Sequence, residues 1–134
     1  MLNLIKNINI EVAGYLSVAI VLLTIICHSL VILQVIPYTW INGGRSVSYE
    51  LQKKQSMLGI IVLLMTIPFL LIASNIVTIS IGSLGASIIN IMLWTSVILL
   101  IISVVMQLLG TTFERYVMSI LVFILLVCVF RIAI

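Results

Sequence analysis

Residues 57–80 read MLGIIVLLMTIPFLLIASNIVTIS and contain no Asp, Glu, Lys or Arg. The absence of charge extends over all of residues 55–113 and again over residues 12–44. A water-soluble domain needs charged groups to solvate its surface, so we expect these segments to face lipid. The whole chain is 64% hydrophobic and only 7% charged. This composition places the protein among integral membrane proteins.

Four stretches of the sequence are long enough to cross a membrane. A transmembrane helix needs about 20 apolar residues to span a hydrocarbon core of about 30 Å. The sequence therefore predicts an all-α fold, a four-helix transmembrane bundle that forms a single membrane domain over residues 1–134. The spans are expected at about 12–36, 57–80, 86–109 and 116–134, and the main loop outside the membrane at 37–56.

Short connections predict how the helices follow one another. Residues 81–85 hold two glycines and no charge, which predicts a tight turn and antiparallel packing of the second and third spans. Gly110 is expected to end the third helix, and Thr112 is expected to cap the fourth. The fourth span is almost free of polar residues, so we expect it to face lipid or a second copy of the chain.

The distribution of Lys and Arg predicts an orientation. Cationic residues concentrate on the side that carries the loops 37–56 and 110–115, with fewer beside the termini. Cytoplasmic loops usually hold the excess of Lys and Arg, so these two loops are predicted to be cytoplasmic and both termini outside. The expected location is the plasma membrane.

The loop 37–56 contains the densest polar chemistry of the chain. Adjacent glycines can present several backbone N–H groups to one anion, and an arginine can bind that anion through two parallel hydrogen bonds. Two readings stay open: an ordinary turn with a topology signal, and a site for a lipid headgroup or other anion. The candidate residues of such a site are Asn42, Gly43, Gly44, Arg45, Lys53 and Lys54.

Four polar residues lie within the expected spans and form a second set of candidates. His28 is the only ionisable residue well inside a span, and such residues are often functional. The plainer interpretation is a neutral imidazole that bonds a neighbouring helix, as amide side chains also do. Counting helical turns predicts an outer polar level near one membrane face and an inner level near the other. The candidates are Asn75 and Asn90 at the outer level, and His28 and Gln107 at the inner level.

Several classes of partner are disfavoured by the sequence. Cys27 and Cys128 belong to no CxxC motif and lack further ligands, so we expect no metal centre and no cofactor. The net charge of +3 comes from cations beside the spans. Their natural partners are anionic lipid headgroups rather than nucleic acid.

These features favour a non-enzymatic membrane protein that binds a lipid headgroup or other anion at the loop 37–56, a membrane partner, or both. One alternative is a small oligomeric transporter or channel for an apolar or cationic solute. A second alternative is an interfacial enzyme that acts on a lipid, although no spacing ties a nucleophile to a base. Because four helices form a thin bundle, we also expect self-association or binding to another membrane protein.

Overall fold

The computed structural model describes residues 2–134 and confirms the all-α fold. Four helices are long and apolar enough to span a membrane, the last of them including a π-helical turn at its start. The elements are α1 (Leu2–Lys6), α2 (Ile10–Ile32), α3 (Tyr49–Ala73), α4 (Ser83–Leu108), the π-helical turn (Glu114–Met118) and α5 (Ser119–Ala133), with two short 3₁₀ turns at Tyr38–Trp40 and Asn42–Gly44.

Polar side chains define where the helices begin. The Asn9 side chain accepts a hydrogen bond from the Glu11 backbone N–H at 2.8 Å and caps α2. Ser48 caps α3, because its Oγ accepts from the Leu51 N–H at 3.3 Å, as its position before a helical run predicts. The residue that caps the last helix is Thr111, not Thr112 as expected.

Thr111 and Glu114 form a reciprocal pair at that start. The Glu114 N–H donates to Thr111 Oγ1 at 3.3 Å, while the Thr111 N–H donates to Glu114 Oε2 at 3.0 Å. This arrangement is a capping box, which requires a hydroxyl and an acidic side chain three residues apart. Thr112 lacks that spacing to Glu114, which explains why the cap falls one residue earlier.

The first two spans end earlier than the hydropathy predicts. α2 stops at Ile32 instead of residue 36, and α3 stops at Ala73 instead of residue 80. Just beyond these ends, Gln34 and Asn75 adopt left-handed backbone conformations, with φ of 59° and 60°. A residue in the left-handed conformation ends a helix. Because the residues before and after these ends are apolar, the hydropathy does not change there and cannot locate the ends.

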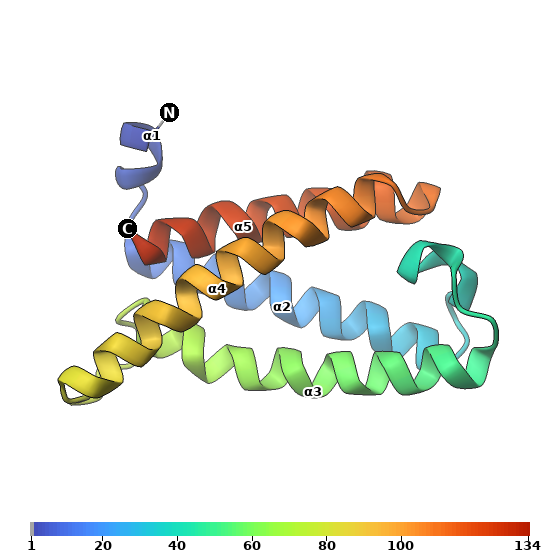
Figure 1. Ribbon diagram of the computed structural model, residues 1–134, viewed down its shortest axis with the longest axis horizontal. Helices are drawn as coiled ribbons and strands as arrows, with labels where there is room; N and C mark the ends of the chain where they lie inside the picture. The colour runs from blue at the N-terminus through green and yellow to red at the C-terminus, as the bar shows by residue number, and fades with distance from the viewer. Residues whose placement is uncertain (1) are drawn as a thin grey trace.

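The packing order of the helices differs from the order along the chain. α2 packs between α3 and α5, and α4 packs mainly against α5 (Figure 1). Consecutive helices α3 and α4 do not pack closely, contrary to the expectation of antiparallel neighbours. The connection between them covers residues 74–82, which is long enough to let α4 cross to the far side of α5.

α5 is the most buried of the long helices, but its outer face stays open, with Ile120 56% and Phe123 55% exposed, as expected for a span that faces lipid or a second copy. In its most apolar window 39% of the residues are buried, against 11% for both α3 and α4. The core therefore lies along α2 and α5, with Ala13, Ile20, Val21, Leu125 and Val129 among its members. α5 is central because it packs against α2 and against α4.

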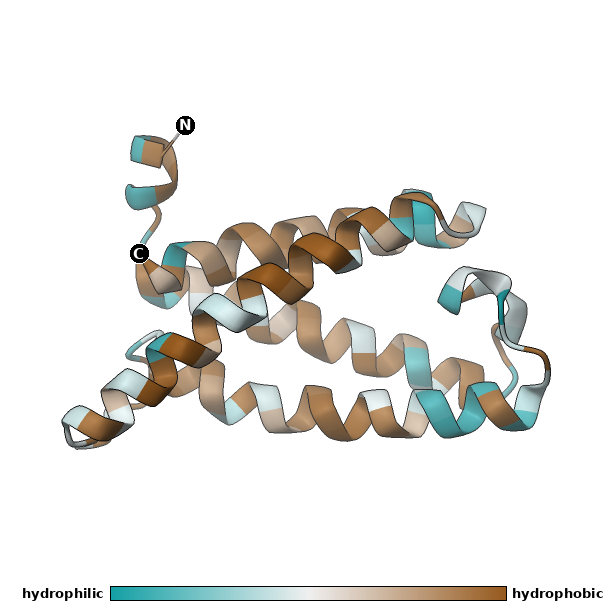
Figure 2. Ribbon diagram, viewed as in Figure 1, coloured by the Kyte–Doolittle hydropathy of each residue, from teal (hydrophilic) through white to brown (hydrophobic). Residues whose placement is uncertain are grey.

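The molecule has two chemically distinct ends (Figure 2). Both termini and the connection 74–82 lie at one end, and the segments 37–48 and 109–113 lie at the other (Figure 1). Hydrophilic residues gather at this second end, at the start of α3 and in the segments beside it. Its cytoplasmic location stays a prediction.

Candidate functional site

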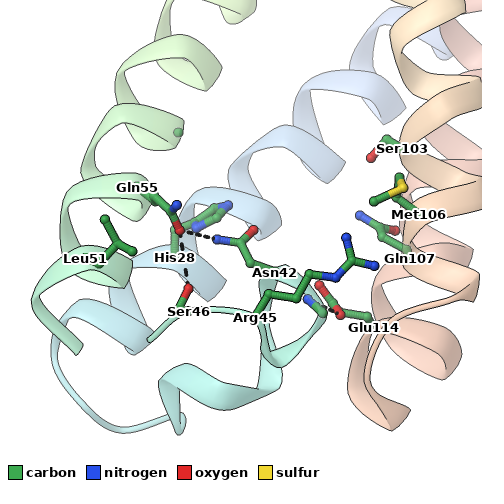
Figure 3. A pocket seen from close by; sticks show the side chains of 12 residues that line it. His28, Asn42, Arg45, Ser46, Leu51, Gln55, Ser103, Met106, Gln107 and Glu114 are labelled. Atoms are coloured by element: carbon green, nitrogen blue, oxygen red, sulfur yellow. Dashed lines mark hydrogen bonds between the residues drawn. The ribbon is translucent and has the colours of Figure 1, made fainter. Parts of the chain in front are cut away.

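A cavity of about 590 Å³ opens at the hydrophilic end of the bundle, where α3 and α4 diverge. α2 contributes His28, the turn after it contributes Asn42, Gly43 and Arg45, and α4 contributes Gln107. The structure thus brings candidates from the loop and from the inner polar level to one place (Figure 3). A volume of this size suits a small ligand or a lipid headgroup.

The turn that lines the mouth of the cavity is left-handed over three successive residues. Asn42, Gly43 and Gly44 have φ of 55°, 67° and 65°. Gly44 also leaves little room for a side chain, since a Cβ there would lie 3.1 Å from the Thr39 carbonyl oxygen. Glycine carries no steric cost in this conformation, which explains the Gly-Gly pair.

The backbone groups of this turn already have partners within the chain. The Gly43 N–H donates to Glu114 Oε2 at 2.8 Å, across 71 positions of sequence. The N–H groups of Gly44 and Arg45 close the turn onto the carbonyls of Ile41 and Asn42 at 3.2 Å. The anion that the glycines hold is therefore the carboxylate of Glu114, which is only 7% exposed.

The guanidinium of Arg45 remains as the free cationic group of the turn. Arg45 is exposed and extends across the cavity toward Gln107 and Glu114 (Figure 3). The Glu114 carboxylate takes its hydrogen bonds from Gly43 and from Thr111, not from Arg45. A guanidinium without a carboxylate partner is well suited to bind a phosphate or carboxylate through two parallel hydrogen bonds.

A network of amide and hydroxyl side chains fixes the turn to α3. Gln52 is fully buried, and its Oε1 accepts from Asn42 Nδ2 at 2.9 Å and from Ser46 Oγ. Asn42 Nδ2 also donates to Gln55 Oε1 at 2.9 Å. Because each buried amide group here has a partner, the network holds the turn in one position over the cavity.

His28 joins the same network from inside the membrane-spanning part of α2. Its Nδ1 lies 3.2 Å from Ser56 Oγ, and Ser56 Oγ in turn accepts from Gln52 Nε2 at 3.1 Å. Gly59 of α3 also faces the imidazole, since a Cβ there would lie 3.6 Å from His28 Nε2, and both residues line the cavity. Hydrogen-bonded side chains therefore connect the loop to a point within the span.

On the α4 wall of the cavity, a buried polar atom lacks a hydrogen-bond partner. Gln107 Oε1 is shielded from solvent and has no hydrogen-bond partner among the described residues 2–134. Ser103 lies one helical turn deeper on the same wall. Buried polar atoms without partners are rare in native proteins, so this wall is incomplete without a bound molecule or water.

Other candidates lie outside this cavity. Gly44 supports the turn without lining the cavity, and Lys53 and Lys54 project from α3 elsewhere. Asn75 and Asn90 are exposed near the opposite end of the bundle. Among residues 2–134, no group of three or more His, Cys, Asp or Glu side chains is placed to hold a metal ion.

Sequence reasoning missed four residues that build the site. The capping-box spacing of Thr111 and Glu114 was a usable signal for a helix start, although not for contact with Gly43. Gln52 and Gln55 occupy one face of the first turns of α3, and polar residues there look like an ordinary solvated face.

No protein-family model, curated protein or solved structure matches the chain. The chemistry of the cavity is therefore the basis for assigning a function.

Proposed function

We propose that this protein is a non-enzymatic membrane protein that binds the phosphate of a lipid headgroup in the cavity between α3 and α4. The observation that carries the proposal is the exposed Arg45 guanidinium, which extends into a polar cavity between α3 and α4 (Figure 3). These two helices do not pack against each other at this end of the bundle. A lipid can reach this place sideways, because α3 and α4 do not close on each other.

The surroundings of Arg45 favour a ligand held at the membrane surface. Trp40, on the neighbouring turn, packs on Phe113 with ring centroids 5.6 Å apart. Aromatic side chains of this kind concentrate at the headgroup level of membranes. The mouth of the cavity therefore lies at the depth of lipid phosphates, while its deeper walls from α3 and α4 border the hydrocarbon.

The two alternative functions find less support in the geometry. His28 and Ser56 are within hydrogen-bond distance, as a base and nucleophile would be, but Ser56 is fully buried and accessible to no substrate. A transport path for a cationic solute would need polar groups along the whole bundle. Asn75 and Asn90 do not line the cavity, which is confined to the loop end.

Arg45→Gln tests the proposal most directly. The probe is phosphatidylglycerol added to the purified protein in detergent, and native mass spectrometry measures the fraction of protein that carries one lipid. A hydrogen bond to a charged group is worth about 1.5–3 kcal/mol, so we expect the dissociation constant to rise about tenfold or more. Arg45→Lys should recover only part of the affinity, because an ammonium cannot form the two-pronged contact.

Lys54→Gln is the matched control, since Lys54 is an exposed cation outside the cavity. It should leave the affinity near that of the parent protein. Equal affinities of the parent, Arg45→Gln and Lys54→Gln would refute the headgroup site. Equal affinities of the parent and Arg45→Lys would show that Arg45 supplies only charge.

A further inference from the structure

The polar groups of the cavity are arranged by depth along α4. In Figure 3, Arg45 lies near the mouth, Gln107 lies beside its guanidinium, and Ser103 lies farther into the bundle. Gln107 and Ser103 are four residues apart on one helix, which separates them by about 6 Å along its axis. A bound molecule thus meets a cation at the surface and neutral donors at two deeper positions.

The hydrogen bonding of Ser103 differs from that of Ser96, which lies two turns earlier on the same helix. Ser96 Oγ donates to the Met92 carbonyl at 2.8 Å, the usual arrangement for a serine within a transmembrane helix. Ser103 Oγ makes no such bond among the described residues and lines the cavity instead. Its hydroxyl proton is available to a ligand.

Gln107 supports the same conclusion independently. Its amide nitrogen, a donor, faces the cavity in Figure 3 and makes no hydrogen bond among the described residues. A polar group left unpaired at the depth of the hydrocarbon costs free energy, because neither lipid tails nor bulk water can bond it. The cavity therefore offers unused donors at the levels of both Gln107 and Ser103.

A ligand that uses these two donors needs acceptors at two depths. We infer that the lipid bound here is a diacyl glycerophospholipid, with its phosphate on Arg45 and its ester carbonyls accepting hydrogen bonds from Gln107 and Ser103. This inference rests on the proposed function and specifies its ligand. Ester carbonyls lie just inward of the phosphate in such lipids, whereas a polyprenyl phosphate or a diether lipid has no carbonyl there.

The test compares diester phosphatidylglycerol with a diether phosphatidylglycerol of the same chain length. Each intramembrane hydrogen bond is worth about threefold in affinity, so the parent protein should bind the diester lipid about five- to tenfold more tightly. Ser103→Ala and Gln107→Leu should each reduce this preference about threefold, and the double variant should abolish it. The readout is native mass spectrometry of the detergent-purified full chain.

Ser96→Ala is the control, because Ser96 lies on the same helix outside the cavity. It should keep the full preference for the diester lipid. The affinity of each variant for the diether lipid serves as its internal measure of folding, since that lipid offers no ester carbonyl to Ser103 or Gln107.

Two outcomes separate this inference from the proposed function. Equal binding of both lipids by the parent protein, with both weakened by Arg45→Gln, overturns the ester contact and leaves the headgroup site standing. Binding of both lipids that is insensitive to Arg45→Gln overturns the headgroup site and the ester contact together.

Discussion

Glu114→Ala should release the turn at residues 42–44 from the α4–α5 connection. In the parent protein one oxygen of Glu114 accepts from the backbone N–H groups of Gly43 and Thr111, at 2.8 and 3.0 Å. The bond from Thr111 is also the side chain's half of the capping box that starts the last helix. Alanine removes all of these contacts at once and leaves two N–H groups to find other partners.

The expected loss of stability follows from these contacts. Hydrogen bonds to a charged group contribute about 1.5–3 kcal/mol each, and the bond to Thr111 includes what the side chain adds to the helix cap. The desolvation of a carboxylate that is only 7% exposed offsets part of this sum. We expect a net decrease of about 2–4 kcal/mol for Glu114→Ala, and about half of that for Glu114→Gln, which keeps an acceptor oxygen.

Two measurements check this prediction. Equilibrium unfolding in mixed detergent micelles gives the change in free energy of unfolding, and hydrogen exchange reports on the turn itself. Loss of about 2 kcal/mol of local stability corresponds to about thirtyfold faster exchange of the Gly43 amide. Glu50→Ala is the control, because Glu50 is an exposed residue in the first turn of α3 and should change stability by less than about 0.5 kcal/mol. If Glu114→Ala behaves like Glu50→Ala in both assays, the contact between Glu114 and Gly43 does not hold the turn.

Two further predictions concern packing and orientation. Gly14→Ala should destabilise the bundle by about 1–3 kcal/mol, because a Cβ there would collide with the buried Ser74 side chain and lie 2.8 Å from Ile76 Cδ1. Gly82→Ala is the control and should leave stability unchanged, because a Cβ there meets no atom within 4 Å. Unfolding in detergent of both variants, and of the double variant Gly14→Ala with Ser74→Gly, measures the difference. Val47→Cys, at a side chain that is 90% exposed, should react with a membrane-impermeant maleimide only after cells are opened; labelling of intact cells would reverse the predicted orientation.

The sequence predicted those parts of the fold that depend on local composition. Charge-free runs located four spans, because lipid excludes charge residue by residue. Ser48 stands before a helical run, where a serine commonly caps the helix, and in the structure its side chain does so. Counting turns from the helix ends put His28 and Gln107 at one level, and the structure places both at one cavity.

Other features depend on contacts between residues that are distant in the sequence. Nothing near Gly43 indicates that its amide bonds Glu114, 71 positions away. The order in which α2 and α5 form the centre of the bundle is likewise invisible in hydropathy, because all four spans have nearly equal mean values, between 2.4 and 2.6. Helix ends were misplaced where apolar residues continue past a left-handed residue, as they do after Gln34.

The division of work between Glu114 and Arg45 follows from this arrangement and explains how a phosphate site can form here. A Gly-Gly turn with free N–H groups would attract an anion by itself, and the cation beside it would then be neutralised by the same anion. In this protein Glu114 binds the Gly43 amide and fixes the turn, while its hydrogen bonds leave Arg45 uncommitted. Because α3 and α4 diverge at the same end, the guanidinium extends into a space that lipid can enter. The buried carboxylate therefore holds the turn in place, and the proposed headgroup site assigns recognition of the ligand to the arginine.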